Sequence, residues 1–211
     1  NVDISGLQEM GNNYFSWGSL MIIFLGALMA IFSGASEIPR DISTMMISCI
    51  LSKELSRHDY ILGKFLGILA ICFSYCFMWL TFFLIFRAFL STAEIDLQFI
   101  IHQYLALFIL IPICSCSVFF SCLFGDVVAM IFSSFYIFAG FANSFTPYIM
   151  DVNSELSVIV NVIYYIIPNF SYFIGGSASF IDIMSLIVYS LSMGLLFLFS
   201  SQSIFKYGDI Y

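Results

Sequence analysis

The charged side chains of this chain gather in one short segment between two long apolar runs. Residues 37–64 hold four of the six Lys and Arg residues. These four are Arg40, Lys53, Arg57 and Lys64. Basic side chains beside a narrow apolar stripe are suited to docking a helix into the groove of another protein. The segment therefore predicts a contact surface rather than an active site.

Catalytic chemistry has little support elsewhere in the sequence. The two histidines, His58 and His102, are too few for a haem or metal site within a bilayer. Four cysteines form two close pairs, Cys72 with Cys76 and Cys114 with Cys116. Without nearby His or carboxylate groups they are interpreted as small packing residues. Neither a G-x-S-x-G turn nor a G-x-x-x-x-G-K-[ST] phosphate loop occurs. We expect no metal, no bound cofactor and no enzymatic activity in this chain.

Composition places the contact surface in a membrane protein. Hydrophobic residues make up 62% of the chain and charged residues 9%, far fewer charges than a soluble domain carries. A membrane-spanning helix needs about 20 apolar residues, and barrel-type alternation is absent. The prediction is an all-α, polytopic integral membrane protein whose residues 1–211 form a single transmembrane domain. Five spans are expected, at residues 17–34, 60–90, 99–124, 127–148 and 181–205.

The segment 151–180 does not match a further span. Its apolar run Leu156–Ile167 is too short to cross a bilayer at about 1.5 Å per residue. We interpret it as a surface-lying or re-entrant helix. Our hypothesis is a lid on the outer side that hinges at its glycines, and the alternative is a static re-entrant turn. The lid residues would be Pro168, Asn169, Gly175 and Gly176.

Orientation follows from the basic residues. Short loops rich in Lys and Arg stay on the cytoplasmic side, which places the charged segment 37–59 and the C-terminus inside and residues 151–180 outside. Arg87, near the outer end of its span, is expected to snorkel to the headgroups or pair with a nearby acid. The chain begins at Asn1 on the outer side without a visible signal peptide. We expect a preceding span, and therefore six in the full-length protein.

The charged segment itself contains a candidate amphipathic helix. Five apolar side chains recur at helical spacing after Pro39, which is tolerated in a first turn. They are Ile42, Met45, Met46, Cys49 and Ile50. Small residues also recur at four-residue spacing in the flanking spans, a pattern that permits close helix contact. These helix-packing positions are Gly26, Ala30 and Gly34 in the first span and Gly63 and Gly67 in the second.

The order of these pieces resembles the permease subunits of ABC transporters of the type-2, exporter class. The resemblance is carried by Glu37, the run Ile50-Leu51-Ser52-Lys53, the pair Ser56-Arg57 and the run Leu62-Gly63-Lys64. The chain departs from the family pattern at Glu54, where the family usually has Pro, and at Ser43-Thr44. The runs 163–170 and 204–206 are also similar to that group. Only the stretch from residue 37 to 67 is reasonably specific.

The resemblance implies a coupling role. In that family the cytoplasmic helix sits in a groove of a separate nucleotide-binding ATPase, which binds the ATP and Mg, and couples its cycle to export. The implied ATPase-coupling residues are Glu37, Arg40, Ile42, Met45, Met46, Cys49, Ile50, Lys53 and Arg57. The implied protein is a multi-pass subunit of the bacterial cytoplasmic (inner) membrane, paired with a second permease as a homodimer or heterodimer.

Apart from the ATPase and the second permease, membrane lipid is the expected partner, and no nucleic acid is. Three alternatives remain open from the residues alone. The amphipathic helix could merely lie in the headgroup layer, as many such helices do. The protein could be a channel or secondary carrier, although such proteins usually place ionisable residues inside their spans. It could also be a membrane scaffold or assembly factor that transports nothing.

Overall fold

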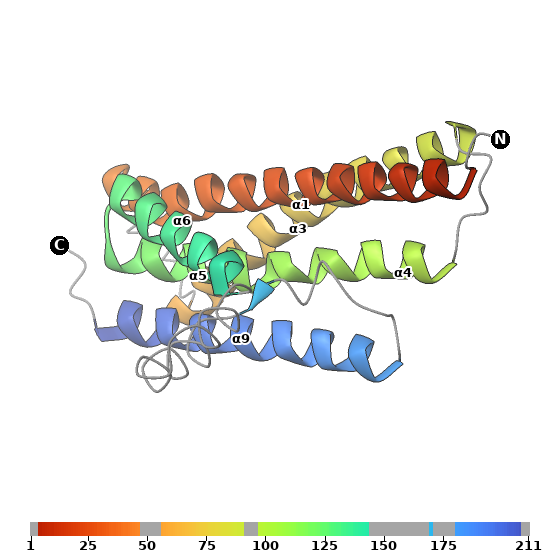
Figure 1. Ribbon diagram of the computed structural model, residues 1–211. Helices are drawn as coiled ribbons and strands as arrows, with labels where there is room; N and C mark the ends of the chain where they lie inside the picture. Colours follow the sequence, from red (N-terminus) through yellow and green to blue (C-terminus); the bar gives the residue numbers. More distant parts are fainter. Residues whose placement is uncertain (1–3, 47–55, 91–96, 144–168, 171–179, 208–211) are drawn as a thin grey trace, which may run out of the picture.

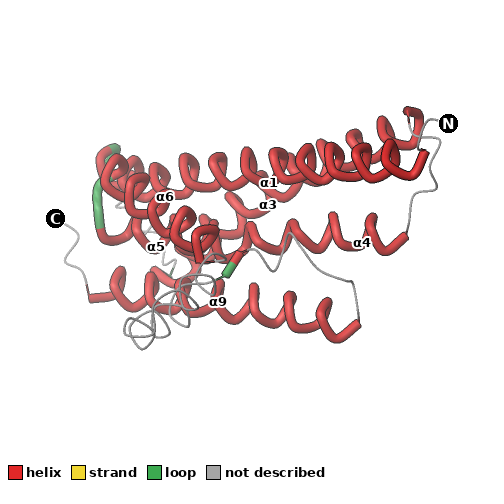
Figure 2. Tube along the Cα trace, viewed as in Figure 1, coloured by secondary structure: helices red, strands yellow, loops and turns green. Residues whose placement is uncertain are grey.

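The protein is helical wherever its fold is described. The computed structural model describes residues 4–46, 56–90, 97–143, 169–170 and 180–207, and these ranges contain helices and no strands (Figures 1 and 2). The elements are α1 (Ile4–Ser43), α3 (Arg57–Leu90), α4 (Leu97–Leu105), the 3-10 helix η1 (Ala106–Ile109), α5 (Leu110–Leu123), α6 (Asp126–Ala142) and α9 (Phe180–Tyr207). The all-α prediction is confirmed for this part of the chain.

Four of these helices are long and apolar enough to cross a membrane. The qualifying stretches are Trp17–Ser43, His58–Phe89, Gln103–Leu123 and Ile183–Ile204. The chain therefore has the build of a membrane protein. A fifth apolar helix, α6, has 17 residues and ends before the expected span 127–148 does. The expected outer segment lies outside the described residues except for Asn169, Phe170 and the beginning of α9.

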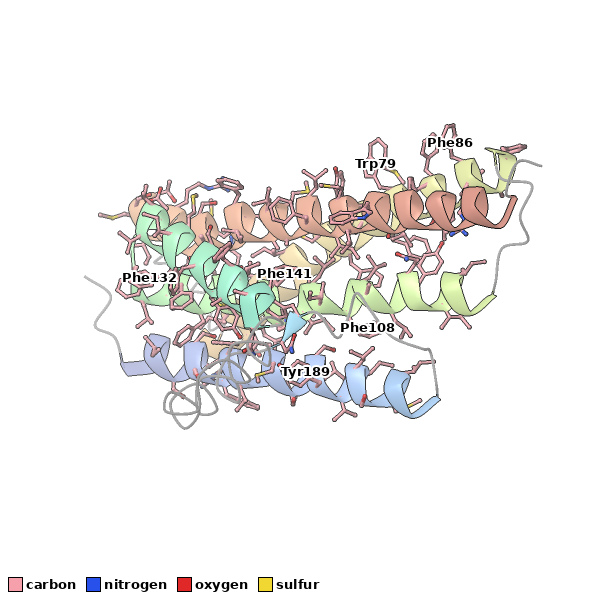
Figure 3. All side chains as sticks on the ribbon, in the orientation of Figure 1. Trp79, Phe86, Phe108, Phe132, Phe141 and Tyr189 are labelled. Atoms are coloured by element: carbon pink, nitrogen blue, oxygen red, sulfur yellow. The ribbon has the colours of Figure 1, made fainter. Side chains whose placement is uncertain are left out.

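Helix α5 lies at the centre of the bundle. It packs against α1, α3, α6 and α9. In the membrane-length stretch Gln103–Leu123, which runs from the end of α4 through η1 and α5, 72% is buried, against 22% in the stretches of α3 and α9. Figure 1 shows α1 along one side of the bundle, α4 and α5 in the middle and α9 on the opposite side, with α3 crossing obliquely behind them. Trp79 and Phe86 on α3 point away from the bundle (Figure 3). Helix α5 is therefore the buried centre of the bundle, whereas much of α3 is exposed on its outside.

The first helix is longer than the predicted span 17–34 at both ends: it begins at Ile4, and Pro39 does not end it. Pro39 lies inside α1, which continues to Ser43. A proline lacks the N–H that would bond the carbonyl four residues earlier, here that of Ala35. The Ser121 hydroxyl of α5 donates to this Ala35 carbonyl at 3.0 Å. A side chain from another helix thus supplies the missing donor, as is common where proline occurs in membrane helices.

The small residues of α1 face other helices of the same chain. A β-carbon at Gly26 would collide with Cys76 of α3, and one at Gly34 would collide with Ser117 of α5. Between them Ala30 is fully buried, and its carbonyl accepts a 3.1 Å hydrogen bond from the Ser117 hydroxyl. By contrast, no atom of the described residues lies within 4 Å of a β-carbon placed at Gly63 or Gly67. The α1 row is an internal packing surface.

Arg87 is buried, with 4% of the residue exposed. This burial does not match a side chain extended toward the headgroups, and the nearby acids that could pair with it lie outside the described residues. Residues 65–86 before it contain no Asp, Glu, Lys or Arg and span about 33 Å at 1.5 Å per residue. This length is close to the thickness of a hydrocarbon core. Lys64 and Arg87 therefore mark the two ends of the membrane-length part of α3.

Candidate functional site

The end of α1 and the beginning of α3 meet in a compact charged cluster. Glu37 and Asp41 lie one helical turn apart on α1, and Tyr60 and Lys64 lie one turn apart on α3. Residues four apart share a face of an α-helix, so two side chains from each helix meet two from the other. We call these four residues the Lys64 cluster.

Lys64 joins both acids of the cluster. Its Nζ lies 2.6 Å from Oε2 of Glu37 and 2.8 Å from Oδ2 of Asp41. The Tyr60 hydroxyl donates a 2.7 Å hydrogen bond to the same Asp41 oxygen. Arg40 adds a longer contact of 3.8 Å between its Nη2 and Oε1 of Glu37. The cluster thus contains three short contacts between α1 and α3.

Burial makes these contacts matter for stability. The Asp41 side chain is only 4% exposed, whereas those of Glu37 and Lys64 are 27% and 24% exposed. A buried carboxylate is costly unless it is paired and hydrogen-bonded. Lys64 and Tyr60 meet that requirement for Asp41. Exposed surface pairs such as Arg40 with Glu37 contribute much less, and the Arg40 side chain is 67% exposed.

The beginning of α3 is fixed locally. The backbone carbonyl of Ser56 accepts the hydrogen bond of the Tyr60 N–H at 3.2 Å. Its hydroxyl oxygen accepts from the Asp59 N–H at 3.1 Å and donates to the Asp59 carboxylate at 2.7 Å. Ser56 is therefore the N-cap of α3, with an acid three residues later as in a capping box. The Ser56-Arg57 pair of the sequence motif marks a helix start.

The end of α1 is an abrupt stop. The Thr44 N–H donates to the Arg40 carbonyl at 3.0 Å and the Met45 N–H to the Ile42 carbonyl at 3.1 Å. Met45 has a φ of 54°, in the left-handed region that terminates many helices and is usually occupied by glycine. The side chains of Ile42, Met45 and Met46 are exposed. Three apolar side chains therefore protrude where α1 ends.

This geometry corrects the predicted start of the amphipathic helix, whose later residues 47–55 lie outside the described part of the chain. Pro39 is not in the first turn of a new helix, and Ile42 belongs to the last turn of α1. Because Met45 is in a left-handed conformation, Ile42, Met45 and Met46 do not lie on one uninterrupted helical face. Cys49, Ile50 and Lys53 lie outside the described residues, and Arg57 is the first residue of α3. The three described members of the stripe are nevertheless grouped at the end of α1.

Sequence reasoning assigned Glu37 to an ATPase contact and did not identify Asp41, Tyr60 and Lys64 as site residues. The structure pairs Glu37 with Lys64 inside the protein. A signal was present in the sequence, because an acid pair spaced by four precedes the connection and a Tyr-Lys pair spaced by four follows it. Antiparallel helices joined by a short connection bring such pairs together.

Of the four predicted lid residues, the structure describes Asn169 alone. The backbone N–H of Asn169 donates to the Tyr189 hydroxyl at 3.1 Å, and Phe170 is fully buried against Tyr136 and Phe141. Phe141 and Tyr189 mark this place in Figure 3. Tyr189 lies nine residues into α9, about 13 Å from the Phe180 end. Asn169 is thus half-buried and bonded to α9, whereas Pro168, Gly175 and Gly176 lie outside the described residues.

The described residues contain no group of three His, Cys, Asp or Glu side chains placed to hold a metal ion. The arrangement at the α1–α3 junction offers ion pairing and exposed apolar contact, which are the means of docking and of fixing helices. Comparison with protein-family models, with curated proteins and with solved structures finds no match for this chain.

Proposed function

We propose that this chain is a membrane-spanning permease subunit of an ATP-driven exporter of the ABC type-2 class. ATP is hydrolysed by a separate ATPase subunit, which also holds Mg. The sequence resemblance between residues 37 and 67 suggests the class. Four membrane-length helices and exposed apolar side chains at the end of α1 support it.

The main support for the proposal is the group of exposed apolar side chains at the end of α1. Ile42, Met45 and Met46 are exposed where α1 ends, immediately beside a charged cluster that closes the junction of two membrane-length helices. Met45 is the most exposed of the three at 74%. An apolar group of this kind on a helix end fits a groove on a partner protein. On this proposal it contacts the ATPase, together with the segment that continues to residue 56.

The first experiment tests the partner. The tagged chain is purified from its native membrane in mild detergent, and copurifying ATPases are identified by mass spectrometry. Met46→Asp places a charge in the proposed contact, and the desolvation penalty should reduce ATPase recovery at least tenfold. The matched control Ser43→Asp adds the same charge at an exposed position on the last turn of α1 and should retain the ATPase.

The outcome also separates the competing functions. Loss of the ATPase in Met46→Asp but not in Ser43→Asp supports the exporter. If no ATPase accompanies the wild-type chain, a channel, a carrier or a scaffold replaces it. If the ATPase remains bound in Met46→Asp, the apolar group belongs to the headgroup layer.

A second experiment tests the orientation, which we propose to be charged cluster and C-terminus inside a bacterial cytoplasmic membrane. Cys72, Cys76, Cys114 and Cys116 are buried in the bundle, and Cys122 is partly buried, so the test is made in a Cys122→Ser background. A membrane-impermeant thiol reagent should therefore label mainly Cys49, and only in inverted vesicles. The control Cys49→Ser should abolish this labelling. Labelling of Cys49 in intact cells would reverse the orientation. Because a bound ATPase can shield the thiol, the chain is labelled when expressed alone.

A further inference from the structure

The Lys64 cluster stands at both ends of the connection between α1 and α3. Residues 44–56 join the two helices, and the proposed ATPase contact begins at Ile42, just before this connection. Asp41 lies two residues before the end of α1, and Tyr60 lies three residues after the start of α3. The connection is therefore closed at its base by Lys64, Tyr60, Glu37 and Asp41 through three short contacts.

The last turn of α1 depends on these contacts because its own hydrogen bonding is incomplete. Pro39 removes the bond to the Ala35 carbonyl, and Ser121 occupies that acceptor instead. The helix then ends at the left-handed residue Met45. A helix end weakened in this way is free to bend at proline. The contact of buried Asp41 with Lys64 and Tyr60 joins this helix end to α3.

We propose that Lys64 is a positioning residue that makes the end of α1 and the beginning of α3 one rigid unit. A displacement of the connection is then passed to both helices together rather than absorbed by bending at Pro39. This inference rests on the proposed function for the source of the displacement, which is the ATPase. The rigidity itself is a property of the chain alone.

Lys64 and Asp41 each make two of the three contacts, and Lys64 is the critical member because it is the one cation among the four residues of the cluster. Without its charge, Glu37 keeps only its longer contact with exposed Arg40, and Asp41 keeps the Tyr60 hydroxyl. Removing one partner from a buried pair is more damaging than removing an exposed one. Tyr60→Phe removes a single hydrogen bond and leaves the ion pairs intact, so its effect should be smaller.

Hydrogen exchange tests the rigidity in the purified chain in lipid nanodiscs. Lys64→Met should speed amide exchange on the order of tenfold in peptides covering both 37–46 and 56–64. Lys64→Arg should restore slow exchange, and Lys206→Met, which removes the same charge from α9, should leave both peptides unchanged. If Lys64→Met does not insert, Tyr60→Phe serves in its place with a severalfold increase. Unchanged exchange at either peptide would overturn the proposal.

Kinetics of the complex tests the coupling. The Lys64→Met chain should bind the copurified ATPase at the wild-type level. It should lower kcat for transport-linked ATP hydrolysis severalfold and leave KM for ATP unchanged. The Lys64→Arg variant should keep the wild-type kcat. Wild-type kcat in a Lys64→Met complex with faster exchange would show a local structural role and overturn the inference. Failure of the proposed function is a distinct result, namely no ATPase bound to the wild-type chain.

Discussion

Helices α1 and α3 carry the same small-residue pattern and use it differently. In α1, Gly26, Ala30 and Gly34 are covered by α3 and α5 of the same chain. In α3, Gly63 and Gly67 have no neighbour among the described residues. The pattern shows where a helix permits close approach, but the identity of the approaching surface is decided by the rest of the fold.

The largest loss of stability is expected from placing a larger side chain in the glycine row of α1. Gly34→Leu would place a side chain into Ser117 of α5 and break the Ser117–Ala30 hydrogen bond. Overpacking of this kind costs about 3 kcal/mol. Unfolding of the purified chain in mixed micelles should show this loss. As a check on the cause, Gly34→Ala should be destabilised as well, and Ser117→Gly should relieve it.

The positions of α3 and α9 could be predicted from the sequence to within a few residues, because uninterrupted apolar runs determine them. The course of α1 through Pro39 could not. The donor for the freed Ala35 carbonyl is Ser121, 86 positions away, and only the folded bundle brings the two together. A proline usually indicates the end of a helix, but the helix can continue where a hydroxyl from a distant part of the chain bonds the carbonyl that proline leaves free.

Only part of the candidate site could be predicted from the sequence, for a similar reason. The charged segment and its exposed apolar residues were evident from composition and spacing. The pairing of Lys64 with Asp41 was not, because it depends on how α1 and α3 are rotated about their axes. That rotation is fixed by packing of Gly26 against Cys76 and of Gly34 against Ser117. The glycine row of α1 therefore also sets the register of the Lys64 cluster.

A medium effect is expected where α3 begins. Ser56→Ala removes the acceptor for the Asp59 N–H, and loss of such an N-cap costs about 1 kcal/mol. Circular dichroism during chemical unfolding measures the change. Ser56→Thr or Ser56→Asp should keep most of the stability, since both can accept the same bond. Equal loss in all three variants would show that the cap is not the cause. The result separates local fixation of α3 from the tertiary fixation of α1.

A smaller effect is expected for the hydroxyl that bridges α5 and α1. Ser117→Ala removes the 3.1 Å bond to the Ala30 carbonyl while leaving the glycine contacts in place. Hydrogen bonds between membrane helices contribute about 0.6 kcal/mol on average. Ser134→Ala on α6, whose exposed hydroxyl bonds within its own helix to Met130, is the matched control and should be near neutral. A loss as large as that of Gly34→Leu would mean that hydrogen bonding, not close packing, holds the α1 row.

The smallest effect on the stability of the isolated chain is expected at Gly63 and Gly67 of α3. Gly63→Leu meets nothing within 4 Å at its β-carbon, and leucine is a better helix former than glycine by about 0.5–1 kcal/mol. The purified monomer should therefore be unchanged or slightly more stable.

The proposed pairing with a second permease adds a condition, because a helix of another subunit packed on Gly63 and Gly67 would be displaced by leucine. Mass measurement in nanodiscs distinguishes the cases. A stable variant with unchanged assembly leaves the row facing lipid, and a stable variant that loses its partner places the subunit contact there. A destabilised monomer would contradict the contrast between α1 and α3, since it would require a neighbour for Gly63 within the chain itself.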